Sequence, residues 1–174
     1  MTFSAPGRAG ILGNPSDIYG GKVLACGVAA RNRCRLTIAE SESGPDDPRL
    51  WDAARTRFPG LPPVRVEWSG DVPRSSGLAG STALLTATLG ALRALTESGP
   101  TGTGEFAEFV RDVERRDAGI VCGYQDAHMT VRGGLRLLDF AGKHPDTDGG
   151  PLPNAARESW ETGRPLPFLL VTTG

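Results

Sequence analysis

The most informative segment of the chain reads Pro73-Arg74-Ser75-Ser76-Gly77-Leu78-Ala79-Gly80-Ser81-Thr82-Ala83-Leu84-Leu85. It runs from proline and small polar residues into Ala, Leu and Thr, which predicts a tight turn followed by a helix as far as Leu95. Leucines recur at steps of three, four and seven, so one face of this helix can be buried: Leu78, Leu85, Leu89, Leu92 and Leu95.

The start of this helix has the composition of an anion-binding site. Gly77 and Gly80 let the backbone approach a ligand closely. Ser81 and Thr82 place hydroxyls beside unpaired N–H groups, where the helix dipole also favours negative charge. The stretch predicts a phosphate ligand, and a Ser/Gly-rich loop that ends in an ordinary helix cap is the alternative.

Length and composition place the chain among single-domain globular proteins. It has 174 residues, of which 39% are hydrophobic and 22% charged. The net charge of -1 gives no electrostatic reason to expect nucleic acid or an anionic membrane as a partner. No apolar run approaches the roughly 18 residues of a membrane span, and the N-terminus lacks a signal-peptide pattern, so we expect a cytoplasmic protein.

Cysteine and histidine usage argues against a disulfide framework or a zinc site. The three cysteines form no C-x-x-C pair, and the two histidines have no companions at metal-ligand spacing. We therefore expect thiols in a reducing compartment.

Hydrophobic patterning predicts strands and helices on both sides of the central stretch. The strands are expected in Lys22–Ile38, 64–68, 135–140 and 168–172, and further helices in 50–58 and 105–117. In the 105–117 helix the pattern predicts a buried face of Phe106, Phe109, Val110 and Val113. The same pattern leaves Glu108, Arg111, Asp112 and Arg115 in solvent.

The segment Gly13-Asn14-Pro15-Ser16-Asp17 predicts a loop whose polar groups converge on a hydrogen-bonding partner. Turn signals flank it on both sides. Asp17 has an alternative role as a side chain that stabilises the turn itself, since Asp and Asn favour turns.

Three stretches, taken together, resemble the GHMP kinases, the family of galactokinase and of homoserine, mevalonate and phosphomevalonate kinases. Residues 5–21, from Ala-Pro-Gly-Arg through Gly-Asn-Pro-Ser-Asp to Gly-Gly, are similar to the first motif of the family. Residues 73–83 resemble its phosphate-binding motif. Residues 114–126, ending in Gly-Tyr-Gln-Asp, resemble the segment with a metal-binding Glu and a catalytic Asp. Within the family the motifs are most similar to glucuronokinase-type sugar kinases, with heptose-phosphate and arabinose kinases close behind.

The resemblance implies an α+β fold. Residues 1–174 would form the ribosomal-protein-S5-domain-2-like N-terminal GHMP kinase domain, with a mixed β-sheet and helices packed on one face. The resemblance runs from about Ala5 to Phe140, and the C-terminal domain of the family has no counterpart in the sequence.

The resemblance also assigns ATP and Mg²⁺ to the central stretch. Backbone N–H groups would wrap the phosphates, and Mg²⁺ would take the hydroxyl of Ser81, or alternatively Thr82, together with the carboxylate of Glu114. The choice of hydroxyl stays open because the family often has serine where this chain has Gly80. The nucleotide contacts implied are Pro73, Ser76, Gly77, Leu78, Ala79, Gly80, Ser81 and Thr82.

The reacting groups implied are Asp126 as the base and Arg8 beside it, keeping Asp126 ionised and steadying the transferred charge. The sugar would be held by Asn14 and Asp17, with Tyr124 and Gln125 lining the same pocket. Asn14-Pro15 stands where galactokinases carry Glu-His, which argues against galactose. A carboxylate-bearing sugar would need a cation, for which Arg74 and Arg132 are available, although either is as well explained as a solvated arginine.

The function expected is ATP-dependent phosphorylation of a sugar hydroxyl, namely the anomeric 1-OH of glucuronate or a related sugar. The alternative is a catalytically silent or truncated half-kinase that binds nucleotide or sugar, or that needs a separate C-terminal partner. The partners expected are a small-molecule sugar and either a second copy of the chain or that C-terminal half.

Overall fold

The computed structural model describes residues 1–45, 48–73 and 75–143, together with the backbone of 158–160. The expected strand at 168–172 and most of the expected loop after Gly142 lie outside these residues, as does Arg74.

One long strand, β2 (Lys22–Ile38), organises the sheet. β1 (Thr2–Leu12) pairs along one edge of it. The other edge is shared by β3 (Val64–Gly70), which pairs with the last residues of β2, and β4 (Leu135–Asp139), which pairs with the first. The three-residue β5 (Glu158–Trp160) extends the sheet beyond β4. These pairs are all antiparallel, so the sheet is mixed only through the isolated parallel bridge between Ser43 and Arg65.

Sequence patterning anticipated β2, β3 and β4 but gave no strand at β1. The reason is local: β1 contains Pro6 and Gly7, and its pairing register shifts between Pro6 and Arg8 and again between Gly10 and Leu12. Proline is tolerated on edge strands and at bulges, and both conditions hold here. The irregular stretch brings Arg8 to the loop that precedes the central helix, where its backbone N–H donates to the carbonyl of Leu78 at 3.0 Å.

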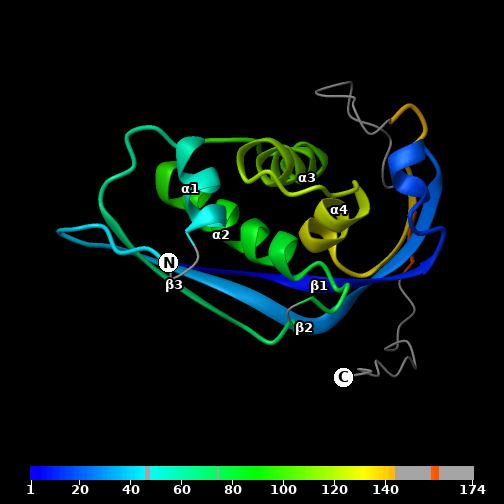
Figure 1. The fold of residues 1–174 in the computed structure, drawn as a ribbon, viewed down its shortest axis with the longest axis horizontal. Helices are drawn as coiled ribbons and strands as arrows, with labels where there is room; N and C mark the ends of the chain where they lie inside the picture. The colour runs from blue at the N-terminus through cyan, green and yellow to red at the C-terminus, as the bar shows by residue number, and fades with distance from the viewer. Residues whose placement is uncertain (46–47, 74, 144–157, 161–174) are drawn as a thin grey trace.

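The helices cover one face of the sheet (Figure 1), as expected for the α+β fold. They are α1 (Arg49–Thr56), α2 (Gly80–Thr96), α3 (Thr103–Asp112) and α4 (Gln125–Arg132). A π-helical turn, η2 (Val113–Asp117), continues α3, and a 3₁₀ turn, η1 (Ser16–Tyr19), links β1 to β2. Among the helices of the described residues, none is long and apolar enough to span a membrane.

The core lies between α2 and the sheet. Leu85, Leu89 and Leu92 are fully buried on one side of α2, which confirms the face predicted from the leucine spacing. They pack in one cluster with inward residues of the strands, such as Leu36 and Val64. Trp51 and Phe58 join it from α1 and the residues after it, also as predicted.

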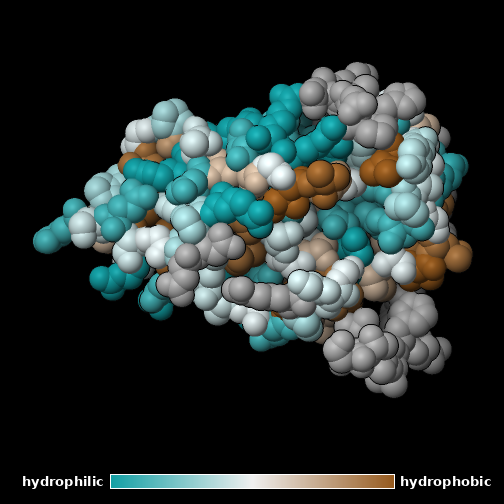
Figure 2. Space-filling model, viewed as in Figure 1, coloured by the Kyte–Doolittle hydropathy of each residue, from teal (hydrophilic) through white to brown (hydrophobic). Residues whose placement is uncertain are grey.

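A second, smaller cluster lies under α4 and consists of Val23, Ala25, Tyr124, Met129, Leu138 and Phe140. It fixes the N-terminal end of α4 against β2 and β4, which positions the residues that follow Tyr124. On the described part of the face in Figure 2, hydrophobic residues occur in separate small groups between hydrophilic ones.

Candidate active site

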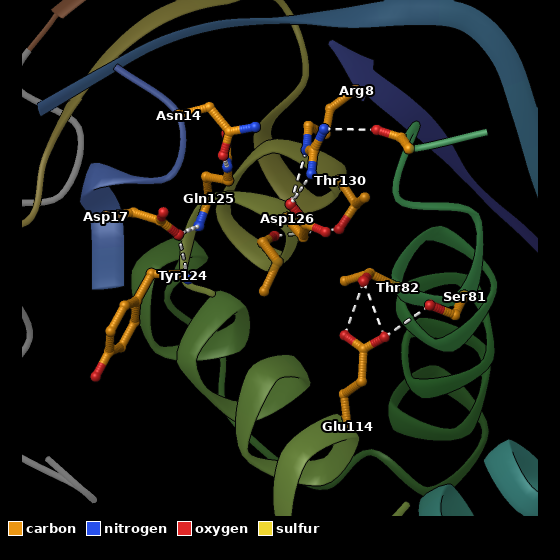
Figure 3. A network of polar contacts seen from close by, with 12 residues as sticks. Arg8, Asn14, Asp17, Ser81, Thr82, Glu114, Tyr124, Gln125, Asp126 and Thr130 are labelled. Carbon is orange, nitrogen blue, oxygen red and sulfur yellow. Dashed lines mark hydrogen bonds and ion pairs between the residues drawn. The ribbon is translucent and has the colours of Figure 1, made fainter. Parts of the chain in front are cut away.

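A cleft of about 370 Å³ lies where the first turn of α2 faces the end of α3 and the start of α4. Six segments supply its walls: β1, the loop before η1 together with η1, α2, the α3–η2 helix, the loop 120–123 and the start of α4. The predicted site residues among its lining are Arg8, Asn14, Asp17, Ser81, Thr82, Glu114, Gln125 and Asp126 (Figure 3). The structure therefore brings together residues from all three motifs.

The loop before α2 and the first residue of α2 turn their carbonyls toward the sheet. The carbonyl of Gly77 accepts from Arg8 Nη1 at 2.7 Å, that of Leu78 from the Arg8 backbone, and that of Gly80 from Asn32 Nδ2 at 2.8 Å. No side chain caps α2, and its first turn holds no acidic residue, so its initial N–H groups and its dipole remain available to an anion.

Two backbone features make this loop geometry possible. A Cβ on Gly7 would lie 2.9 Å from the Leu78 carbonyl oxygen, so glycine permits the close approach of β1 to the loop. Ala79 adopts φ of 57°, a left-handed conformation that costs a non-glycine residue energy and that often marks functional sites.

Arg8 links the loop to the start of α4. Besides Gly77, its guanidinium contacts Asp126 Oδ1 through Nε at 2.7 Å and Nη2 at 2.5 Å. Burial raises the pKa of Asp126, and the charge and hydrogen bonds of Arg8 oppose that rise. The arginine therefore opposes the effect of burial on this carboxylate and favours its ionised form.

Glu114 faces the first turn of α2 from the π-helical turn and is only 1% exposed. Its carboxylate accepts from Ser81 Oγ at 2.9 Å, and Thr82 Oγ1 lies 2.9 and 2.7 Å from its two oxygens. Burial raises the pKa of Glu114, and the two hydroxyls oppose this while the nearby charge of Asp126 adds to it. A buried carboxylate with a raised pKa beside a second carboxylate favours a bound cation.

These oxygen donors fit Mg²⁺. Among the described residues no group of three or more His, Cys, Asp or Glu side chains could hold a metal ion alone. Mg²⁺ usually binds one or two carboxylates and completes its shell with water and substrate phosphates, so one carboxylate and two hydroxyls suit it. Both Ser81 and Thr82 reach Glu114, which keeps both as ligand candidates.

Asp17 is 1% exposed and holds the start of α4 in place. Its Oδ2 accepts the backbone N–H groups of Tyr124 at 2.7 Å and Gln125 at 3.0 Å. Gln125 in turn donates from Nε2 to Asn14 Oδ1, while its buried Oε1 has no partner. The structural role of Asp17 is thus to anchor α4, which differs from the stabilisation of its own turn considered from the sequence. The unpaired Gln125 oxygen in the cleft wall suits a donor such as a sugar hydroxyl.

The prediction that Tyr124 lines the sugar pocket needs correction. Its ring is fully buried and packs in the second hydrophobic cluster, with its centroid 5.7 Å from that of Phe140, and it does not contribute to the cleft lining. The Tyr124 ring belongs to the core beneath the cleft, and its backbone N–H donates to Asp17.

We expect Gly123→Ala to destabilise the domain, because a Cβ at this position would collide with Asp17 Oδ2 and disrupt the anchor of α4. Forced overpacking of this kind costs about 1–3 kcal/mol of unfolding free energy. Chemical denaturation measures it, with Gly44→Ala as the control, since a Cβ on that exposed glycine makes only ordinary contacts with Trp51. Equal stability of the two variants would contradict the anchor.

Cys122 should be a poor nucleophile although it lines the cleft. Burial, and next the charge of Glu114, raise the pKa of its thiol to about 12. Because the thiolate is the reactive form, we expect alkylation at pH 8 at least about 100-fold slower than in the denatured chain. Mass spectrometry of each cysteine checks this, and Glu114→Gln should accelerate the reaction. A folded-state rate like that of a free thiol would contradict the assignment.

A second, larger cavity of about 460 Å³ lies between α2, α3, the end of α4 and β1. Its lining holds Arg31, Arg93 and Arg132 and no carboxylate, so it offers neither a base nor a metal ligand. Arg132, considered for a sugar carboxylate, lies here and not in the cleft.

Arg111, expected in solvent, is instead 5% exposed and lines the cleft. Its position three residues before Glu114 on one helix is the signal that identifies it.

Comparisons with known proteins agree with this arrangement. Residues 49–134 match the family model described as GHMP kinases N terminal domain. The D-glycero-alpha-D-manno-heptose 7-phosphate kinase of Campylobacter jejuni is 39% identical over 72 residues, which are 40% of this chain and 20% of that protein.

Solved structures share the fold. A D-glycero-D-manno-heptose 1-phosphate kinase from Bacteroides thetaiotaomicron has a TM-score of 0.71 at 22% identity, over 84% of this chain and 57% of its own. The mevalonate kinase of Methanococcus jannaschii has a TM-score of 0.66 at 14% identity, over 80% and 53%. The chain thus spans little more than half of these kinases. The fold, the matching segment and the three assembled motifs show that this chain carries the N-terminal domain of the GHMP kinases.

Proposed function

We propose that this domain binds ATP with Mg²⁺ and takes part in transferring the γ-phosphoryl group to a sugar hydroxyl. The observation that carries the proposal is the bridge made by Arg8, which contacts both the Gly77 carbonyl and Asp126. Arg8 thereby links the loop proposed to bind phosphate with the proposed base, and both Arg8 and Asp126 line the cleft together with Glu114.

The chemistry requires little covalent participation by the protein. The N–H groups at the start of α2 would bind the phosphates, and Arg8 would offset charge on the transferred group. The acceptor hydroxyl gives its proton to Asp126 as its oxygen bonds to the γ-phosphorus, and the bond to the leaving ADP oxygen breaks. Mg²⁺ held by Glu114 with Ser81 or Thr82 would neutralise phosphate charge.

The acceptor proposed is the anomeric 1-OH of glucuronate or a related sugar. The names of the two heptose kinases add phosphorylated heptoses as candidates. Both kinds of acceptor combine hydroxyls with a negatively charged substituent, and the cleft offers hydroxyl partners at Asp17 and Gln125.

An ATP-turnover screen tests this proposal with glucuronate, arabinose, galactose and heptose phosphate as acceptors. Turnover with one sugar and its loss in Asp126→Asn would support the proposal. ATP hydrolysis that no sugar stimulates, or sugar turnover that survives in Asp126→Asn, would contradict it.

The alternative is a silent half-kinase, or one that acts with a separate C-terminal partner or as a dimer. The observation that favours it is length, since the chain spans 57% and 53% of the two kinases compared. A second domain that closes the cleft would exclude water from the transfer. Calorimetric binding of Mg·ATP without turnover of any sugar would support this alternative.

A further inference from the structure

The residue behind this inference is Arg111, near the C-terminal end of α3. Its guanidinium carbon lies 3.6 Å from the centroid of the Tyr124 ring, and only 5% of the residue is exposed. Its Nε is buried without a hydrogen-bond partner, while the guanidinium plane stacks on the Tyr124 ring. A buried guanidinium with an unpaired N–H group is costly to fold, so its presence in a cleft wall points to a ligand.

The surroundings of Arg111 hold it in a fixed orientation. The Tyr124 ring beneath it packs against Phe140 and has Lys143 Nζ 5.1 Å from its centroid. Lys143 is held by Glu108 at 2.9 Å, and Glu108 also binds His128 at 2.8 Å. A guanidinium stacked on a fixed ring presents its N–H edge to a ligand with little loss of entropy, and that edge matches carboxylate or phosphate in a bidentate manner.

The location of Arg111 favours the acceptor over the nucleotide. Tyr124, on which it stacks, and Asp17 lie on one side of Asp126, while Ser81 and Thr82 lie on the other (Figure 3). The phosphate-binding loop is on the side of Ser81, and Arg8 is already committed to Asp126 and Gly77. An anion on Arg111 would therefore lie across the base from the triphosphate.

The charges that line the cleft are three carboxylates, those of Asp17, Glu114 and Asp126, and three arginines, Arg8, Arg111 and Arg115. Because the carboxylates repel an anion, an anionic acceptor needs one of these arginines beside it. We propose that Arg111 binds the negatively charged oxygens of the acceptor sugar, a carboxylate or a phosphate, and so selects acidic sugars over neutral ones. This inference rests on the proposed function and names the substrate class of the same cleft.

The test compares acidic and neutral sugars of matching shape, with dissociation constants measured by calorimetry. The first pair is glucuronate and glucose, which tests a carboxylate. The second pair is a heptose phosphate and its parent heptose, which tests a phosphate. Arg111→Met should weaken binding of the preferred acidic sugar by roughly 10- to 100-fold, the usual worth of charged hydrogen bonds. The neutral partner should change less than about threefold. Arg111→Lys should restore only part of the loss, because it keeps the charge without the planar fork.

Matched measurements separate this role from a structural one. Arg93→Met removes an arginine that also stacks on an aromatic ring, that of Phe106, but outside the cleft, and should leave sugar binding unchanged. Mg·ATP affinity should stay the same in Arg111→Met, which a general loss of structure would not allow.

Several results would overturn the inference. An equal loss of affinity for acidic and neutral sugars in Arg111→Met would show that Arg111 does not bind the charged group of the sugar. The absence of a preference for acidic sugars in the parent chain would show the same. Weakened Mg·ATP binding in Arg111→Met would assign the residue to the triphosphate. If no sugar binds while Mg·ATP does, this inference fails and the nucleotide site stands; if neither binds, the proposed function fails with it.

Discussion

Asp126→Asn is expected to lower sugar-dependent ATP turnover by about 10²- to 10⁴-fold, the usual contribution of a positioned general base. Asparagine keeps the size of the side chain but cannot accept the hydroxyl proton. It also removes the charge that Arg8 contacts at 2.5 Å, which leaves the guanidinium with the Gly77 carbonyl as its remaining partner in the bridge. The measurement is initial turnover rate at saturating Mg·ATP.

Two controls make this result specific. Asp71→Asn removes an exposed carboxylate that pairs with Arg33 and does not line the cleft, and it should leave turnover unchanged. Mg·ATP should still bind to Asp126→Asn, because the loop and Glu114 remain. Turnover within a few fold of the parent chain would exclude Asp126 as the base.

Glu114→Gln is expected to raise the unfolding free energy of the metal-free domain at neutral pH. Burial raises the folded-state pKa of Glu114. The contribution of this residue to the unfolding free energy is therefore fully present below the ordinary glutamate pKa, and it is lost as pH rises through the raised folded-state pKa. Glutamine carries no charge and avoids this loss. The stability difference between variant and parent should therefore grow with pH across that window, as measured by denaturation at several pH values.

The same variant should lose its response to Mg·ATP. Ligand at 100 times its dissociation constant stabilises a folded protein by about 2.7 kcal/mol, and without the carboxylate we expect most of this shift to disappear. Glu67→Gln, on an exposed residue that pairs with Arg35, is the control and should respond like the parent. A Glu114→Gln domain that is less stable without metal and equally stabilised by Mg·ATP would refute the metal role.

Much of the fold followed from periodicity, because long amphipathic segments report burial directly. The leucine face of α2 and the full span of β2 are examples. β1 was missed because Pro6 and Gly7 interrupt a strand whose function is to bring Arg8 to the loop. Local rules fail where the chain adopts an irregular conformation at a site.

Most residues of the candidate site were predicted from the sequence, but the sequence did not show which of them line the cleft and which belong to the core beneath it. The motifs placed Arg8, Glu114 and Asp126 in one cleft, and the structure does the same. Helical periodicity assigned Arg111 to solvent because it treats every arginine as a surface residue, and it has no means to register the Tyr124 ring beneath it. A contact between segments distant in sequence is visible only in three dimensions.

The most direct test of the account is the set of backbone amide shifts that a non-hydrolysable ATP analogue with Mg²⁺ produces in the NMR spectrum of this chain. We predict that the largest shifts fall on the amides of Gly77, Ser81 and Thr82, with further shifts at Gln125 and Asp126. Shifts concentrated instead around the second cavity, at Gly90, Thr101 and Val131, would contradict a triphosphate site at the start of α2.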